Sequence, residues 1–469
     1  MNSREIALFA IGPIGAAALS LCMLPLVAWF YSVEDIGRIA MLQVMVSFCL
    51  LLFSLGLDQA YVREYYESEN KPGLLKSVFL PGFLLLVLGG GVCFFEPSFL
   101  AESLFSLDSV MMSFLVVLCF IASFVSRFLS LVLRMQGRGL AFSIGQILPK
   151  MLFLIIMSGY VFFSYGFEFY YLLIAHIFSA VFLTVVYAYL TYKDVSLAYK
   201  QKINLEKLKS MLYFGAPLIM GGAAFWGLTT MDRLFLRSYS NFEELGIYSM
   251  ATNFAAAGLI LQSIFSTVWA PIVYKWAAEG VDASKIHRVT EHLLAVVVFL
   301  FVMAGLGSWV VTFILPEGYR EVRYLLVACM AYPLFYTLSE TTVVGIGVSR
   351  KSGYSMLASI VAVSVNFTGN YLLVPVYGAA GAAISTAFSF WVFLICRTEL
   401  SCLVWRQVPR FKLYVMTLVC LILSFGSAFY SEKGSGLMIL AWGVMGLVAV
   451  WSFRGSIALL VNQVVYFKK

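Results

Sequence analysis

Long apolar stretches separated by short polar segments dominate the hydrophobic pattern of this chain. A run of about 20 apolar residues is the length of a helix that crosses the ~30 Å hydrocarbon core of a bilayer. The pattern therefore predicts an all-α polytopic membrane protein with about fourteen transmembrane helices. The stretches, some only just long enough, are 6–30, 38–57, 77–96, 108–133, 140–163, 168–191, 211–231, 245–272, 292–315, 324–348, 354–376, 380–396, 413–430 and 435–453.

Composition agrees with this pattern and narrows the function classes. Hydrophobic residues make up 62% and charged residues 12% of the chain, which is far from the composition of a soluble domain. The net charge of +7 is spread over many short loops, so we expect no nucleic-acid partner. The eight cysteines lie in or beside apolar stretches without a CxxC pair, so we expect no zinc site, no disulfide framework and no other cofactor.

The positions of the basic residues orient the chain. Most of the 31 Lys and Arg residues fall on one side of the alternating spans, and such a bias marks the cytoplasmic side. This places both termini in the cytoplasm. Arg350 and Arg397 are assigned to cytoplasmic loops, whereas Arg323 and Lys433 are assigned to the outer side. The first span is too long for a cleaved signal peptide and should remain as an anchor.

The chain also contains a weak internal repeat. Residues 34–41 recur at 243–250 with an offset of 209, and landmarks within 138–178 recur at 350–390 with an offset of 212. Each offset covers six helices, so both copies enter the membrane from the same side and should be related by a pseudo-two-fold axis along the membrane normal. Such lobes can enclose a cavity that opens alternately to each side. We expect a first six-helix lobe, a cytoplasmic linker, a second six-helix lobe, and a helical hairpin with a short tail, at 1–192, 193–210, 211–405 and 406–469.

Three runs of residues resemble a known family. Met231-Asp232-Arg233-Leu234-Phe235-Leu236, followed by Glu244-Leu245-Gly246-Ile247-Tyr248-Ser249-Met250-Ala251, resembles the helix 7 to helix 8 signature of bacterial polysaccharide flippases. These belong to the multidrug/oligosaccharidyl-lipid/polysaccharide exporter superfamily. Residues 366–384 resemble the family's helix 11 to helix 12 turn, and Ser54-Leu55-Gly56-Leu57-Asp58 followed by Arg63 resembles the end of its helix 2. The similarity extends over most of residues 1–405.

The resemblance implies a function. It implies a carrier in the bacterial cytoplasmic (inner) membrane that flips a polyprenyl-diphosphate-linked oligosaccharide from the cytoplasmic to the outer leaflet, for surface polysaccharide such as the O-antigen of lipopolysaccharide. Its partners would be this substrate, membrane lipid and other polysaccharide-assembly proteins. The terminal hairpin is similar to the arrangement in lipid II flippases of the same superfamily.

Charged residues inside predicted spans are the candidate site residues, because an ionised side chain at mid-span costs roughly 2.5–3.5 kcal/mol. Arg127 and Lys150 could bind the diphosphate, with a salt bridge or snorkelling as the alternative. Glu340 could carry a proton or sodium ion, with a fixed basic partner as the alternative. Asp232 and Arg233, at the outer end of the predicted span 211–231, are candidates for ion coupling and substrate binding respectively, with an interfacial ion pair as the alternative. Transport could thus be coupled to a proton or sodium gradient.

Two other functional hypotheses remain open. A multidrug or cation antiporter of the same superfamily would bind cations and should not place Arg127 and Lys150 in its lumen. A polytopic glycosyltransferase or polymerase would need a substantial loop carrying paired carboxylates, whereas no predicted loop exceeds about 20 residues. We therefore expect the chain not to be an enzyme, and no catalytic residues are assigned.

Overall fold

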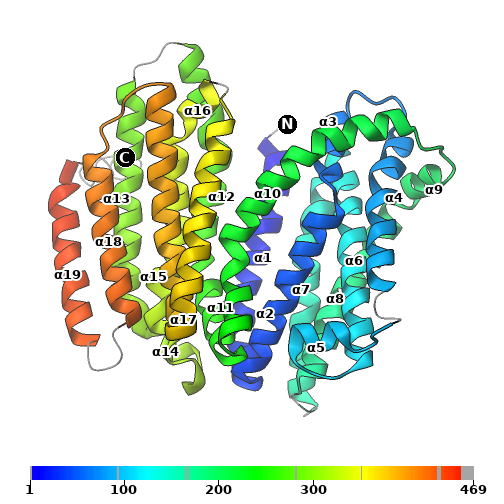
Figure 1. Ribbon diagram of the computed structural model, residues 1–469, viewed down its shortest axis with the longest axis horizontal. Coiled ribbons are helices and arrows are strands. Elements are labelled where there is room, and N and C mark those ends of the chain that lie inside the picture. The colour runs from blue at the N-terminus through cyan, green and yellow to red at the C-terminus, as the bar shows by residue number, and fades with distance from the viewer. Residues whose placement is uncertain are drawn as a thin grey trace. The chain divides into compact units, whose positions relative to one another are not determined.

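Helices make up nearly all of the chain that the computed structural model describes, namely residues 3–91, 95–163, 166, 168–279, 283–349, 351–429 and 435–455, and these residues form no β-strand. Arg350 and Lys433, which were used above to orient the chain, lie outside the described residues. In chain order (Figure 1) the helices are α1 (Ser3–Phe30), α2 (Val33–Phe53), α3 (Leu57–Glu64), α4 (Lys71–Gly90), α5 (Phe99–Phe105), α6 (Val110–Met135), α7 (Gly139–Phe162), α8 (Phe169–Leu190), α9 (Tyr192–Tyr199), α10 (Leu205–Tyr239), α11 (Phe242–Ala255), α12 (Ala257–Ala278), α13 (Ala283–Gly307), α14 (Val311–Ile314), α15 (Val322–Thr342), α16 (Val344–Val348), α17 (Gly353–Val404), α18 (Phe411–Phe429) and α19 (Ser435–Ser452).

The apolar helices confirm a polytopic all-α membrane protein. Among the described residues, 10 helices are long and apolar enough to cross a membrane, or 11 if the bent pair α11 and α12 is one span. Two shorter apolar helices, Gly15–Phe30 and Gly436–Ser452, coincide with the first and last predicted spans. α17 contains two predicted spans, 354–376 and 380–396, joined at Gly378, where φ is 49° and ψ is −127°. With α17 counted as two, the fourteen predicted stretches each have a helical counterpart.

The repeat found in the sequence corresponds to a helix start. Ser32 caps α2 by accepting a hydrogen bond from the backbone N–H of Asp35 at 3.1 Å. Asn241, 209 residues later, caps α11 in the same way by accepting from the N–H of Glu244 at 2.8 Å. Acidic residues occupy the first turn of both helices, where they stabilise the positive end of the helix dipole. The repeated residues are therefore those that start a helix.

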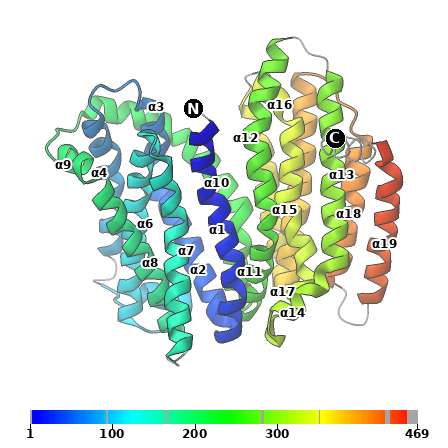
Figure 2. The ribbon, with the colours of Figure 1, turned by 180° about the vertical axis from the view of Figure 1, so that it is seen from behind.

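The chain divides into two compact units, Met1–Trp226 and Gly227–Lys469, with the boundary inside α10. The segment 193–210, predicted as a linker, falls in the first unit. Within that unit α1 packs on α7, and α6 packs on α8 (Figure 2). A Cβ atom at Gly12 would lie 2.8 Å from the Cα of Ser143, so α1 and α7 are nearly in backbone contact.

In the second unit, α15 packs on α17 and the hairpin α18–α19 covers α13. Trp442 of α19 is fully buried, with its ring 6.5 Å from and parallel to that of Phe301. Its indole N–H donates to Ser427 of α18 at 3.1 Å. Lys412 at the start of α18 pairs with Glu291 of α13 at 2.6 Å. The terminal hairpin is thus part of the core of the second unit.

Candidate functional site

Lys150 is a cation in a membrane helix whose contacts are all with neutral groups. It lies on α7 directly after Pro149, and its Nζ donates to the carbonyl of Ala16 at 3.0 Å and to the hydroxyl of Ser20, both on α1. Among the described residues, no carboxylate lies within 4.0 Å of its Nζ. An ammonium group has three donors, so one donor and the full charge remain available to a ligand.

Arg127 differs from Lys150 because it has an acidic partner. Its Nη2 donates to Oδ2 of Asp58 at 2.8 Å. The Asp58 side chain is 10% exposed, whereas that of Arg127 is 44% exposed, so the guanidinium keeps donors free on the side away from the carboxylate. The salt bridge named as the alternative is present. Substrate binding by Arg127 remains a prediction.

Asp58 is positioned by the 54–58 motif that carried part of the family resemblance. Leu55 and Gly56 have φ of 52° and 66°, and this left-handed turn joins α2 to α3. A Cβ atom at Gly56 would lie 2.6 Å from the carbonyl oxygen of Gly215 on α10, so only glycine allows this approach. Asp58 then occupies the first turn of α3, where the helix dipole favours its charge.

Asp232 is the centre of a buried polar cluster in the second unit. Its side chain is 2% exposed. It accepts hydrogen bonds from the hydroxyl of Tyr248 on α11, from Thr386 of α17 at 3.4 Å, and from the backbone N–H of Arg233 at 3.0 Å. Residues of α10, α11 and α17, far apart in sequence, are therefore joined at one carboxylate.

Two asparagines of α17 extend this cluster. The amide of Asn366 donates to the hydroxyl of Thr386 at 3.1 Å, and the amide of Asn370 donates to the backbone and side-chain oxygens of Asn366 at 2.9 Å and 3.0 Å. Both side chains are fully buried. The Oδ1 atom of Asn370 is buried without a hydrogen-bond partner, which is costly in a folded protein. Asn366 is thus a buried member of the polar cluster, whereas the neighbouring Phe367 and Thr368 are exposed.

Arg233 forms no ion pair with Asp232, although the two are adjacent. Its Nη2 donates to the hydroxyl of Thr252 at 3.1 Å and its Nη1 to the carbonyl of Thr229 at 3.4 Å. The guanidinium also lies over the ring of Tyr248, with its Cζ 5.9 Å from the ring centroid. The adjacent ion pair named as the alternative is therefore absent. Arg233, like Lys150, is held by neutral groups.

Glu340 has a fixed basic partner. Its Oε1 accepts from Nη1 of Arg397 at 2.6 Å, and the two side chains are 15% and 13% exposed. Arg397 also donates to the hydroxyl of Ser339 at 2.8 Å and lies over the rings of Tyr336 and Phe393 at 5.2 Å and 4.7 Å. The sequence placed Arg397 in a cytoplasmic loop. This was wrong, because α17 continues to Val404 and the guanidinium is buried by its partner.

The predicted site residues thus fall into three kinds. The charged groups of Lys150 and Arg233 donate only to neutral groups, whereas Arg127 and Glu340 belong to ion pairs. Asp232 belongs to a polar cluster whose other members the sequence did not mark as site residues. Two features of the sequence could have indicated these other members. Some lie in the family-like runs, and they are polar residues within otherwise apolar spans.

The chain was compared with known proteins. A family model described as polysaccharide biosynthesis protein matches residues 4–276. An uncharacterised membrane protein of Methanocaldococcus jannaschii is 22% identical over 402 residues, which cover 77% of this chain and 76% of that protein. The match to the family model confirms the resemblance inferred from the sequence.

Solved structures are similar in fold. The lipid II flippase MurJ, in an inward closed conformation, has a TM-score of 0.68 at 14% identity and covers 96% of this chain and 100% of its own. A multidrug resistance MATE family transporter of the MOP superfamily, in an inward-facing conformation, has a TM-score of 0.58 at 16% identity and covers 82% of this chain and 95% of its own. Since the family model spans more than half of the 469 residues, this multi-pass membrane chain belongs to the polysaccharide biosynthesis protein family.

Proposed function

We propose that the chain flips a polyprenyl-diphosphate-linked oligosaccharide from the cytoplasmic to the outer leaflet of a bacterial inner membrane, with both termini in the cytoplasm. The observation that carries the proposal is the environment of Lys150, a half-buried ammonium whose contacts are a carbonyl and a hydroxyl. A diphosphate brings negative charge and several acceptor oxygens, which such a donor binds strongly. The family match supports the same substrate class.

A cation antiporter fits these residues less well. The charge of Lys150 is not cancelled by a contacting carboxylate among the described residues, so it would repel a cationic drug. A lipid II flippase remains the second candidate, because the MurJ structure covers 96% of this chain, which includes the terminal hairpin. Both candidates share a diphosphate-linked lipid as substrate and differ in the sugar.

The buried cluster around Asp232 is the proposed coupling site. Carboxylate, amide and hydroxyl oxygens are the ligands that hard cations prefer, and Asp232, Asn370 and Thr386 supply one of each. The unpartnered Oδ1 of Asn370 is an acceptor that a sodium ion would satisfy. Proton uptake by Asp232 is the alternative form of coupling. Glu340 is the weaker candidate, since Arg397 already neutralises it.

Coupling by sodium is tested by the thermal stability of the purified chain in sodium chloride and in choline chloride. A ligand that binds only the folded state at 100 times its Kd stabilises it by about 2.7 kcal/mol. We expect sodium to raise the melting temperature of the wild type and to have no effect on Asp232→Asn. A melting temperature of the wild type that depends on pH and not on sodium would assign the cluster to protons.

Substrate flipping is tested in a strain that lacks the gene, by measuring lipid-linked repeat units in each leaflet. Lys150→Ala should reduce outer-leaflet delivery at least about tenfold, because a hydrogen bond to a charged group contributes roughly 1.5–3 kcal/mol. Lys150→Arg should retain part of the activity. Lys193→Ala removes the same charge from an exposed position on α9 and should be neutral.

The outcomes separate the candidates. Normal outer-leaflet delivery in the deletion strain would eliminate the flippase proposal. Full transport by Lys150→Ala at a normal level in the membrane would remove Lys150 from the site. A deletion that changes only sensitivity to cationic drugs would favour the antiporter, and accumulation of lipid II alone would favour the lipid II flippase.

A further inference from the structure

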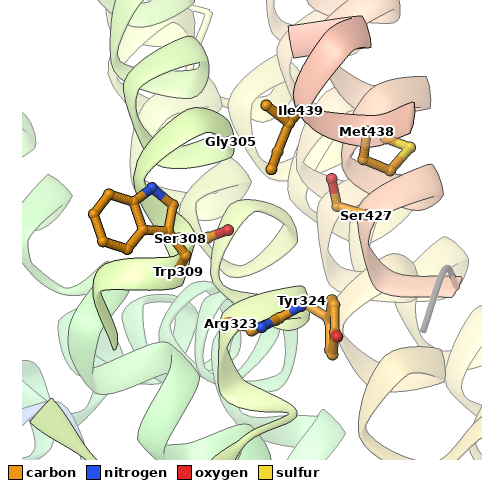
Figure 3. A pocket seen from close by; sticks show the side chains of 8 residues that line it. All are labelled: Gly305, Ser308, Trp309, Arg323, Tyr324, Ser427, Met438 and Ile439. Atoms are coloured by element: carbon orange, nitrogen blue, oxygen red, sulfur yellow. The ribbon is translucent and has the colours of Figure 1, made fainter. Parts of the chain in front are cut away.

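A pocket lies in the second unit, and none of the predicted site residues lines it. It is formed where the end of α13 and the following 3-10 turn meet α15, α18 and α19, and Figure 3 shows the side chains that line it. The lining residues are Gly305, Ser308, Trp309, Arg323, Tyr324, Ser427, Met438 and Ile439. These residues come from four helices and one turn, so the pocket exists only because the hairpin α18–α19 packs on this unit.

Several polar groups of this pocket can donate hydrogen bonds, namely the guanidinium of Arg323 and the hydroxyls of Tyr324 and Ser308. Arg323 makes no hydrogen bond or ion pair with the described residues, and its guanidinium lies 4.4 Å from the ring centroid of Tyr324. The hydroxyl of Tyr324 is buried without a hydrogen-bond partner. Ser308 offers a second hydroxyl that bonds to no described residue. Ser427 already donates to the carbonyl of Leu423 at 3.0 Å, so its oxygen serves mainly as an acceptor.

The carboxylate nearest in sequence does not neutralise Arg323. Glu321 makes no ion pair with Arg323. Burial, and after it the charges of Glu244 and Glu243, raise the pKa of Glu321. Glu321 is therefore close to other acids, and the positive charge of Arg323 remains uncompensated within the pocket.

The size of the pocket limits what it can hold. Its volume is about 50 Å³, whereas a single water needs roughly 10–15 Å³. A small anion of a few heavy atoms fits, and an oligosaccharide does not. Three donors, two from α15 and one from the 3-10 turn, suit a tetrahedral oxyanion with several acceptor oxygens, because the planar fork of arginine matches such oxygens.

The surroundings of the pocket match the edge of a bilayer. Arg323 is assigned to the outer side by the distribution of basic residues. Trp309 in the wall is 51% exposed, and nearby Phe313 is 75% exposed. Aromatic side chains gather at the level of lipid headgroups. The apolar side chains of Met438 and Ile439 complete the wall opposite Arg323 and Tyr324 (Figure 3).

We propose that this pocket binds a phosphate group at the outer end of the second unit, through Arg323, Tyr324 and Ser308. The group is either the phosphate of a membrane lipid or inorganic phosphate, and both present anionic, non-bridging phosphate oxygens to the same donors. The site is separate from the proposed path of the diphosphate-linked substrate and does not depend on it. An occupied pocket would tie α15 to the hairpin α18–α19.

The test uses the purified full-length chain in detergent after removal of bound lipid. Phosphatidylglycerol and diacylglycerol are titrated separately and the lipid adducts are counted by native mass spectrometry. Radioactive inorganic phosphate is measured by equilibrium dialysis. Phosphatidylglycerol adducts without inorganic phosphate binding identify a lipid headgroup, and binding of inorganic phosphate identifies a free anion. Both support the proposal.

The variants decide whether binding occurs at this pocket. Arg323→Gln should weaken binding at least about tenfold, and Tyr324→Phe, which keeps the ring and removes only the hydroxyl, about threefold or more. Arg320→Gln removes the same charge from an exposed position three residues earlier and should change binding less than twofold. If Arg323→Gln fails to fold, Tyr324→Phe and Ser308→Ala carry the test.

Three results would overturn the proposal. These are no binding of either probe to the wild type, equal binding of phosphatidylglycerol and diacylglycerol without binding of inorganic phosphate, and equal weakening by Arg323→Gln and Arg320→Gln. The last result would show that a diffuse positive surface attracts the phosphate, and the pocket would then have no specific role.

Discussion

A double-mutant cycle on Glu340 and Arg397 can distinguish the contribution of this ion pair to stability from a role of Glu340 in transport. The two side chains meet at 2.6 Å and are 15% and 13% exposed. Removal of one member of a buried pair leaves an uncompensated charge and costs about 3–5 kcal/mol, whereas replacement of both members is often nearly neutral. Arg397→Met should therefore destabilise the chain by about 3–5 kcal/mol.

The second single variant should behave differently. Glu340→Gln keeps a hydrogen-bond acceptor for Arg397, and the guanidinium keeps its bond to Ser339 and its contacts with two aromatic rings. Its cost should therefore be smaller, about 1–3 kcal/mol. The double variant should recover much of the loss caused by Arg397→Met, so the coupling free energy should be at least about 2 kcal/mol.

Stability is measured by thermal unfolding in detergent, and transport is measured well below the lowest melting temperature. If Glu340 is only a partner for Arg397, the double variant should transport at near the wild-type rate. Additive destabilisation in the cycle would refute the buried-pair argument. A folded Glu340→Gln variant that transports nothing would show that Glu340 carries the coupling ion, despite its partner.

Two further predictions concern backbone positions. Gly56→Ala and Gly137→Ala both place a side chain at positive φ, but only Gly56 faces a backbone, that of Gly215. Gly137→Ala should lower the free energy of unfolding by about 1–2 kcal/mol, and Gly56→Ala should lower it clearly more, as measured by thermal unfolding. Equal losses of stability would contradict the close approach of α10 to Gly56. Glu244→Ala removes the carboxylate that accepts from the N–H of Ala379 at 2.7 Å. The second half of α17 should then lose about 0.5–2 kcal/mol of capping stabilisation, and limited proteolysis should cleave the chain near the break at Gly378. Unchanged cleavage would show that the break needs no cap.

Much of the fold follows from local properties of the sequence. The positions of the spans could be predicted because the length of an apolar stretch is a property of neighbouring residues. The two predicted spans of α17 meet at the non-helical Gly378, as expected. The cap of the second one was not predicted, because the N–H of Ala379 donates to Glu244, 135 residues away. Nothing in the segment around 378 identifies that partner.

The candidate site was predicted only in part, for the same reason. Arg127, Lys150, Asp232, Arg233 and Glu340 were predicted as site residues from their charge within or at the end of apolar spans. Which of them would be neutralised was not evident. The partner of Arg127 is 69 residues away and that of Glu340 is 57 residues away, and the packing of helices decides both.

The amino-acid sequence by itself determined where most helices lie and that the starts of α2 and α11 repeat, since both depend on hydrophobicity or capping within a few turns. Only the tertiary structure decided the pairing of those charges: it left Lys150 with neutral partners and joined Asp232 to Tyr248 and Thr386. The physical reason is that a buried charge requires a partner within a few ångströms, and distant segments are brought that close by packing alone.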